Sequence, residues 1–240
     1  MFADNSHNST SKPTFTPSGK VNNLYENILI ENISIFLNDL QNKEFPKKPN
    51  EVNYNQEFFA VVQRSLMYPP KGVIVVPNYN DLDTMGVNVT KSVDFAFLSS
   101  VQSSSKKPLY SVEAKRLPTG TGTRKKEYVT GYYLKSKSPC GGILRFKTGD
   151  HGYGLTESAL IGYIEENTFD HWYITINGWI REEAGKIGSW ATNECLKNLA
   201  KDESGAFARC YSVARRSSLP NIKLFHLWVV IPSSLKYCRK

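Results

Sequence analysis

Two segments in the middle of the chain alternate apolar and polar residues, which is the pattern of a β-strand with one buried face. Residues 92–98 read S-V-D-F-A-F-L and residues 109–115 read L-Y-S-V-E-A-K, with a polar stretch at 102–108 between them. The polar stretch predicts a turn, so the two strands are expected to lie side by side. A chain with this pair in its middle has to build a β-sheet around it.

The residues on either side of this strand pair predict helices first and then an alternation of helices and strands. Apolar residues at three- and four-residue steps predict helices over 22–40, 55–67, 156–166 and 190–200, with a possible helix over 126–134. Short apolar runs predict further strands over 72–76, 172–180, 209–213 and 224–231. This order predicts the α/β class, with a central mixed β-sheet flanked by helices.

Two glycine-rich segments interrupt this pattern. The run 141–154 leaves two interpretations open, a hairpin that reaches over a substrate or a structural pair of β-turns. The loop that begins at Pro118 reads P-T-G-T-G-T-R-K-K and lacks the Gly-Lys-Ser/Thr order of a phosphate-binding loop. Nucleotide binding is therefore not expected there.

The length of 240 residues predicts one domain over 21–240, preceded by a flexible leader over 1–20 that is rich in Ser, Asn, Thr and Pro. No stretch is long and apolar enough for a membrane span or a secretory signal. The cysteines are far apart in the chain and form no CxxC pair, which predicts free thiols in a reducing compartment, with the cytoplasm as the default. They are Cys140, Cys195, Cys210 and Cys238.

Lysine and arginine gather between residues 106 and 147, where eleven of them face only two glutamates. The net charge of this window is +9, against a formal charge of +8 for the whole chain. Clustered cations gain free energy on a nucleic acid by releasing its counterions, which favours a polyanion as partner. A solvated surface is the alternative. The candidate nucleic-acid contacts are Arg116, Arg124, Lys125, Lys126, Lys135, Lys137, Arg145 and Lys147.

Three charged residues stand on the predicted strand pair. Glu113 and Lys115 are two residues apart, so they point to the same face of an extended strand. On the neighbouring strand, Asp94 points to the face opposite that of the apolar residues beside it. If the strands pair, one face presents all three side chains. Two carboxylates held close together repel each other unless a hard divalent cation binds between them. Asp94 and Glu113 are therefore candidate ligands of Mg²⁺ or Mn²⁺.

Asp94 followed by Glu113-x-Lys115, on consecutive strands after an N-terminal helix, resembles the PD-(D/E)XK restriction-endonuclease-like nuclease superfamily. The resemblance covers roughly residues 22–135 and leaves 136–240 as a C-terminal α/β extension. Val93 stands where some members have a proline. The resemblance implies a restriction-endonuclease-like core in which Asp94 and Glu113 bind the metal and Lys115 orients water or stabilises the developing charge.

Many members of this superfamily also have a glutamate on the first core helix. Glu26 flanks the apolar stripe of the predicted helix 22–40 and is the candidate, because Glu31 lies nearly opposite that stripe. The implied activity is Mg²⁺-dependent hydrolysis of DNA phosphodiester bonds, in restriction, anti-phage defence or repair. Cutting a duplex implies a homodimer or a partner subunit. The alternatives are a catalytically inactive DNA-binding module and a nuclease that acts on RNA.

Overall fold

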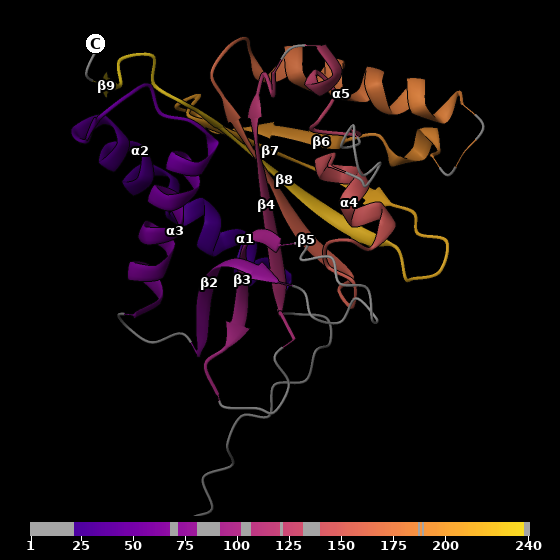
Figure 1. Cartoon of the computed structure of the whole chain (residues 1–240), viewed down its shortest axis with the longest axis horizontal. Coiled ribbons are helices and arrows are strands. Elements are labelled where there is room, and N and C mark those ends of the chain that lie inside the picture. Colours follow the sequence, from indigo (N-terminus) through magenta and orange to yellow (C-terminus); the bar gives the residue numbers. More distant parts are fainter. Residues whose placement is uncertain are drawn as a thin grey trace, which may run out of the picture.

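A seven-stranded mixed sheet runs through the centre of the computed structural model, which describes residues 22–67, 72–80, 92–101, 107–120, 122–131, 140–186, 188 and 190–237 (Figure 1). The strand order is β2-β3-β4-β5-β8-β7-β6. The strands are β2 (Val73–Asn80), β3 (Ser92–Ser99), β4 (Tyr110–Leu117), β5 (Glu157–Ile164), β6 (Lys197–Lys201), β7 (Phe207–Ala214) and β8 (Ile222–Val230). The predicted α/β class with a mixed sheet is confirmed.

The direction of the strands divides the sheet into three parts. At the centre, β4, β5 and β8 run parallel to one another. On one side β2, β3 and β4 form an antiparallel meander, and on the other side β8, β7 and β6 are antiparallel. The predicted strand pair 92–98 and 109–115 is thus confirmed as β3 and β4, which are neighbours in the sheet.

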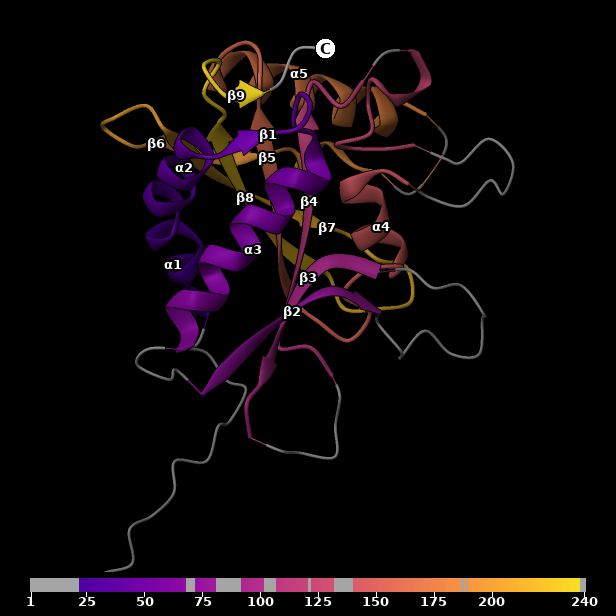
Figure 2. The ribbon, with the colours of Figure 1, turned by 60° about the vertical axis from the view of Figure 1, so that its left-hand side comes forward.

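Three helices cover one face of the sheet (Figures 1 and 2). They are α1 (Asn22–Glu31), α2 (Ile33–Asn42) and α3 (Glu51–Met67). Their apolar residues, among them Phe36 and Phe58, pack against Val112 and Ala114 of β4 in one hydrophobic core. Ala114 therefore faces these helices. Glu113 and Lys115, which alternate with it, face the opposite side of the sheet.

The predicted single helix 22–40 is divided at Asn32. The buried side-chain amide of Asn32 donates to the carbonyl of Ile28 at 2.7 Å and to the hydroxyl of Ser65 on α3 at 3.0 Å. A short polar side chain that binds the backbone in this way competes with the regular helical bonds. The same amide ties the junction of α1 and α2 to α3.

The other face of the sheet carries α4 (Gly142–Thr148) and α5 (Phe169–Ala184). Phe146 of α4 and Trp172 and Ile176 of α5 pack with Leu160 of β5 in a second hydrophobic core. Since helices lie on both faces, β5 is buried along nearly its whole length.

Three predictions for the C-terminal half were wrong. Residues 156–166 form β5 and not a helix, because a strand buried on both faces has no alternation and its apolar spacing resembles a helix. Residues 172–180 belong to α5, whose buried Trp172, Ile176 and Ile180 recur at four-residue steps. Residues 190–200 form a short 3-10 helix and the edge strand β6.

The glycine-rich run 141–154 is neither a hairpin nor a pair of β-turns. Its first half is α4, and Gly149 ends the helix in the left-handed conformation, with φ of 81°. In the described part of the possible helix 126–134 the chain forms turns after a 3-10 helix, η1 (Gly122–Arg124). Residues 132–139 lie outside the described residues, and so does the predicted leader 1–20.

The C-terminal end of the described chain pairs with the connection between α2 and α3 in a small parallel sheet of β1 (Glu44–Phe45) and β9 (Lys236–Tyr237), which Figure 2 shows beside these helices. Cys140, Cys195 and Cys210 are free thiols, and Cys238 lies outside the described residues. Among the described residues, no helix has both the length and the apolar character that crossing a membrane requires.

Candidate active site

The strands β3 and β4 separate where the three predicted site residues lie. Their pairing ends at Phe95 opposite Val112, although β3 begins at Ser92 and β4 continues to Leu117. Beyond this point β4 pairs only with β5, so the outward amides of β4 lose their strand partner. Such amides need other acceptors. We call this opening between β3 and β4 the fork.

Two carboxylates accept hydrogen bonds from the amides that the fork exposes. Oδ2 of Asp94 accepts from the amide of Ala114 at 2.6 Å. Oε2 of Glu51 accepts from the amide of Arg116 at 2.9 Å. The backbone of β4 thus holds both carboxylates beside the Glu113-Ala-Lys115 segment.

Glu51 was not among the predicted residues, and it begins α3. The preceding Asn50 caps this helix, because the side chains of Asn50 and Asn53 accept each other's backbone amides at 3.3 and 3.0 Å. This reciprocal pair is a form of the capping box. A glutamate in the first turn is also favoured by the helix dipole. The sequence Pro49-Asn-Glu-Val-Asn53 therefore contains a signal for the start of a helix. The helix begins at Glu51, four residues before its predicted beginning.

Lys115 lies among these acidic groups. Its ammonium donates to Oε1 of Glu113 at 2.8 Å, lies 3.4 Å from Oε1 of Glu51, and also donates to the carbonyl of Ala114 at 2.8 Å. Burial alone would lower the pKa of Lys115, but three surrounding carboxylates, Glu113 foremost, outweigh burial and raise the pKa. The ammonium is a fixed positive charge at the fork.

Glu113 is buried and in contact with three basic side chains. Besides Lys115, the guanidinium of Arg145 on α4 donates to Oε1 at 3.1 Å, and Nε2 of His151 lies 3.6 Å from Oε2. Burial alone would raise the pKa of Glu113, but these basic groups, led by Lys115, hold the pKa well below its usual range. Glu113 is therefore an ionised carboxylate inside the protein.

Asp94 differs from Glu113 in its ionisation. Burial raises the pKa of Asp94 to about 8, and the negative charge of Glu113 adds to the rise. Two carboxyl groups that share a buried site are commonly separated in this way. Asp94 accordingly keeps its proton at neutral pH as long as nothing else compensates the charge of the pair.

His151 completes the surroundings of Glu113 and was expected to be an ordinary core or surface histidine. It is fully buried, and burial lowers its pKa to about 4, so the ring is neutral at pH 7. Its Nε2 lies 3.0 Å from the Arg145 guanidinium, which can only donate. Nε2 therefore accepts, and His151 holds Arg145 in place beside Glu113.

Asp94 and Glu113 are the residues at the fork that could hold a magnesium ion. Asp94 and Glu113 are hard oxygen donors, and the repulsion between them is what a divalent cation relieves. In the described part of the chain, no three Asp, Glu, His or Cys side chains converge closely enough to hold an ion by themselves. Two carboxylates are nevertheless enough for Mg²⁺, because this ion usually keeps several water ligands.

The structure does not bring Glu26 to this site. Its carboxylate accepts from the Tyr211 hydroxyl on β7 at 3.0 Å and lies 3.8 Å from the ammonium of Lys223 on β8. Glu26 faces the sheet, as its position beside the apolar stripe predicted. It lies over strands β7 and β8, however, while the fork is between β3 and β4. The helix glutamate of this site is Glu51.

Most of the basic residues predicted to contact nucleic acid, among those that the structure describes, form ion pairs with acidic residues. Arg116 pairs with Glu165, Arg124 with Glu127, Lys126 with Glu182, Arg145 with Glu113 and Lys147 with Glu194. Lys125 is exposed and has no ion pair among the described residues. Lys135 and Lys137 lie outside the described residues. The basic window is thus less cationic than its sequence indicated.

Lys147 cannot serve as a phosphate contact. Its side chain is 2% exposed, and its ammonium binds Oε1 of Glu194 at 2.5 Å and the carbonyl of Arg215 at 2.8 Å. The amides that Glu194 accepts, those of Ala191 and Arg215, complete this buried cluster. Exposed pairs are worth little and can exchange a carboxylate for a phosphate, whereas a buried pair cannot.

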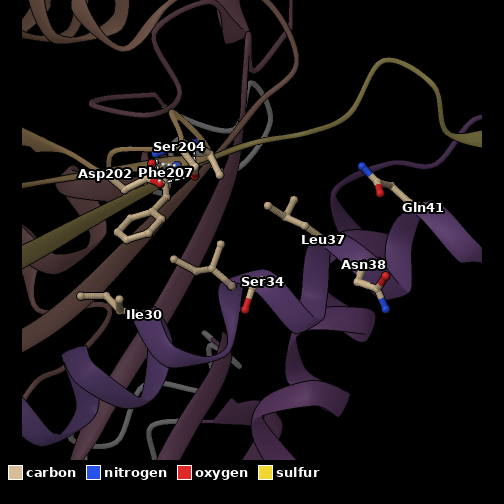
Figure 3. Close-up of a pocket in the computed structure, with 10 residues that line it drawn as sticks. Ile30, Ser34, Leu37, Asn38, Gln41, Asp202, Ser204 and Phe207 are labelled. Atoms are coloured by element: carbon tan, nitrogen blue, oxygen red, sulfur yellow. Dashed lines mark hydrogen bonds between the residues drawn. The ribbon is translucent and has the colours of Figure 1, made fainter.

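A cavity of about 460 Å³ lies away from the fork, between α2 and the turn that joins β6 to β7 (Figure 3). Leu37 of α2 and Phe207 of β7 form part of its apolar wall. Its carboxylate, Asp202, accepts the amides of Ser204 and Phe207 and thereby shapes the turn. The cavity therefore does not contribute to the candidate active site.

Comparisons with protein-family models, with curated proteins and with solved structures find no match to this chain.

Proposed function

We propose that this chain is a metal-dependent nuclease of the PD-(D/E)XK type that hydrolyses DNA phosphodiester bonds at the fork between β3 and β4. The observation that carries the proposal is the convergence of Asp94, Glu113, Lys115 and Glu51 on two strands and one helix end. Three of these residues were expected from the sequence pattern. The fourth, Glu51, begins α3, whereas the resemblance implies a glutamate on the first core helix, for which Glu26 was the candidate.

Each group has a chemical task in this proposal. Asp94 and Glu113 would hold a Mg²⁺, which would supply an acidified water and compensate the charge on the phosphate. The ammonium of Lys115 orients the attacking water or stabilises the charge that develops on the phosphorane oxygens. Glu51 keeps Lys115 charged and in position through its contact at 3.4 Å. Arg145, which contacts Glu113 at 3.1 Å, is a further cation at the fork.

A second candidate function is nucleic-acid binding without hydrolysis. The observation that favours it is the full set of contacts around Glu113, whose oxygens already face Lys115, Arg145 and His151. A carboxylate compensated in this way does not need a metal. In this case Asp94 stays protonated and the cations at the fork bind phosphate only for affinity.

One experiment separates the two functions. The purified full chain is incubated with duplex DNA, single-stranded DNA and RNA, each with Mg²⁺, with Mn²⁺ or with EDTA. Metal-dependent cleavage that disappears in Asp94→Asn supports the nuclease, and the preferred substrate identifies the nucleic acid. Binding that is equally tight in EDTA, without cleavage of any substrate, supports the second function. Cleavage of unchanged rate in Asp94→Asn would falsify the site.

A further inference from the structure

The short helix α4 is fastened at both ends, and it carries the arginine that contacts Glu113. A helix of seven residues is not stable by itself, so its free backbone groups need partners. At its beginning, the amides of Gly142, Ile143 and Leu144 donate to the carbonyls of residues 127–129 at 2.8 to 3.1 Å. These bonds occupy the first orphan donors of the helix.

Arg216 holds the other end of α4 and the loop that follows it. It stands just after β7, its side chain is buried, and its guanidinium donates to five backbone carbonyls. The bond from Nε to the carbonyl of Phe146 measures 2.7 Å, and this carbonyl in the last turn of α4 also accepts the amide of Gly149 at 3.2 Å. The other four acceptors are the carbonyls of His151, Gly152, Tyr153 and Leu155, at 3.0 to 3.5 Å.

The segment that Arg216 binds is the one that forms part of the candidate active site. Arg145 lies one residue before Phe146, and His151 is in the loop itself. A backbone bond from the amide of His151 to the carbonyl of Arg145, at 3.1 Å, couples the two. Both side chains contact Glu113 and each other. Moving this loop therefore moves two of the three basic groups around Glu113.

We propose that Arg216 is a positioning residue of this site, which fixes the end of α4 and the following loop so that Arg145 and His151 stay against Glu113. This inference rests on the proposed function only for its effect on cleavage. The positioning itself is a property of the protein without metal or nucleic acid. The chain offers a matched control in Arg215, which is adjacent, exposed and of the same charge.

The first readout is independent of activity. In metal-free protein labelled with ¹⁵N, the side-chain Nε–H resonance of Arg145 is identified by its disappearance in Arg145→Gln. We expect this resonance to shift or broaden in Arg216→Gln and to stay in place in Arg215→Gln, with all variants folded by circular dichroism. An unchanged Arg145 resonance in folded Arg216→Gln overturns the proposal, whether or not the protein is a nuclease.

The second readout is a double-mutant cycle in kcat, with DNA and Mg²⁺ saturating. Displacing a reacting group by about 1 Å can lower a rate by about 100-fold, so a large effect of Arg216→Gln is expected. If Arg216 acts through Arg145, its substitution lowers kcat much less in the Arg145→Gln background than in the wild type. Equal factors in both backgrounds overturn the proposal. Loss of cleavage in Arg215→Gln as well would indicate a general charge effect and overturn it too.

Arg216→Gln can fail to fold, because five carbonyls would lose their bonds to the guanidinium, and of these the carbonyls of Phe146 and Gly152 keep a backbone donor. Arg216→Lys then takes its place, since a lysine keeps the positive charge at the end of α4 and up to three of the bonds. The same displaced Arg145 resonance and the same non-additivity with Arg145→Gln are expected, to a smaller extent. A folded Arg216→Lys whose Arg145 resonance is unchanged and whose effect on kcat is fully additive overturns the proposal.

Discussion

Glu51 and Arg116 are 65 residues apart in the chain and are joined by a hydrogen bond of 2.9 Å from the backbone amide of Arg116 to the Glu51 carboxylate. This bond fixes the start of α3 to the part of β4 that β3 has left. It also places the second oxygen of Glu51 beside Lys115. A fold that connects a helix end to a strand at the fork therefore supplies a third carboxylate to a site for which the sequence pattern named two.

The role of Glu51 is testable against that of Glu26. We expect Glu51→Gln to lower cleavage by about 10- to 100-fold, as removal of a supporting interaction typically does, because Lys115 is deprived of a charged partner. Glutamine still accepts the Arg116 amide, so the fold should be retained. Glu26→Gln is the matched control, since it keeps an acceptor for Tyr211 and lies away from the fork. Equal activities of the two variants would show that Glu51 has no part in the reaction.

Binding of the metal is expected to be visible in stability without any substrate. A ligand that binds only the folded state raises the free energy of unfolding by RT ln(1 + [L]/Kd). Mg²⁺ or Mn²⁺ should therefore raise the melting temperature of the wild type, and EDTA should reverse the rise and abolish cleavage. Asp94→Asn should show no such rise. A metal-induced rise of the same size in Asp94→Asn would place the ion elsewhere.

The raised pKa of Asp94 predicts how the metal-free protein responds to pH. An unfolded aspartate releases its proton near pH 4, whereas the folded protein holds the proton until about pH 8. The folded state thus binds the more protons between these values, and this group makes the free energy of unfolding fall as pH rises through the window. Asp94→Asn removes the effect and keeps an acceptor for the Ala114 amide.

The measurement is urea unfolding in EDTA at several pH values between 4 and 8. The stability of Asp94→Asn relative to the wild type should grow with pH and level off above about pH 8. Whereas Asp94→Asn should stabilise the protein, Glu113→Gln should lower the free energy of unfolding, because Lys115 and Arg145 are left without their buried counter-charge. A difference between Asp94→Asn and the wild type that does not vary with pH would contradict the assignment.

How far the sequence could predict this molecule depended on whether the signal was local. The alternation in β3 and β4 is local, and it correctly predicted the two strands and the common location of Asp94, Glu113 and Lys115. The burial of β5 on both faces is decided by helices far away in the chain, and the prediction there was wrong. Trp172 and Ile176 were predicted in a strand, because aromatic and β-branched residues favour strands.

The partners of charged residues could not be predicted for the same reason. Lys147 belonged to a basic window by sequence, but its partner Glu194 is 47 residues away in the chain, in the 3-10 helix Thr192–Glu194. Arg145 was expected only as a phosphate contact, and the structure adds its bond to Glu113. Glu51 had a local signal, the Asn50 cap, but the resemblance implies a glutamate on the first core helix, and Glu26 flanks the apolar stripe of that helix.

Lys147 and Lys125 provide a prediction that separates structural from surface cations. Lys147→Met leaves Glu194 buried without its positive partner, and breaking a buried pair of this kind costs about 3 kcal/mol or more in the free energy of unfolding. Lys125→Met removes an exposed charge and should change that free energy by less than about 0.5 kcal/mol. Chemical denaturation of both variants decides the matter. Similar stabilities would mean that the Lys147–Glu194 pair contributes nothing to folding.

The cations of the 118–131 loop are expected to bind the phosphate backbone of a nucleic acid. Arg124, Lys125 and Lys126 lie on or beside the 3-10 helix η1, and the carboxylates that pair with Arg124 and Lys126 are on the same loop and on α5. The guanidinium of Arg124 is exposed, with 66% of the side chain accessible, so it can bind a phosphate while it stays paired with the buried Glu127. The loop follows β4 directly, which brings it near the fork.

Replacing these three residues together with alanine should therefore weaken DNA binding and flatten its salt dependence without removing the chemistry. Removing one phosphate contact reduces the slope of log K against log salt by about 0.9 for a duplex, so three contacts correspond to a decrease of roughly 2 to 3. Binding is measured over a series of salt concentrations, and turnover is measured at saturating DNA.

The matched control replaces Lys197, Lys201 and Arg209, three exposed cations on β6 and β7, with alanine. Both triple variants change the net charge equally, so a long-range charge effect would flatten both slopes alike. A decrease confined to the loop variant places the DNA backbone on η1, whereas an unchanged slope in that variant would make the loop a solvated surface and leave Arg145 and the fork as the path of the phosphate.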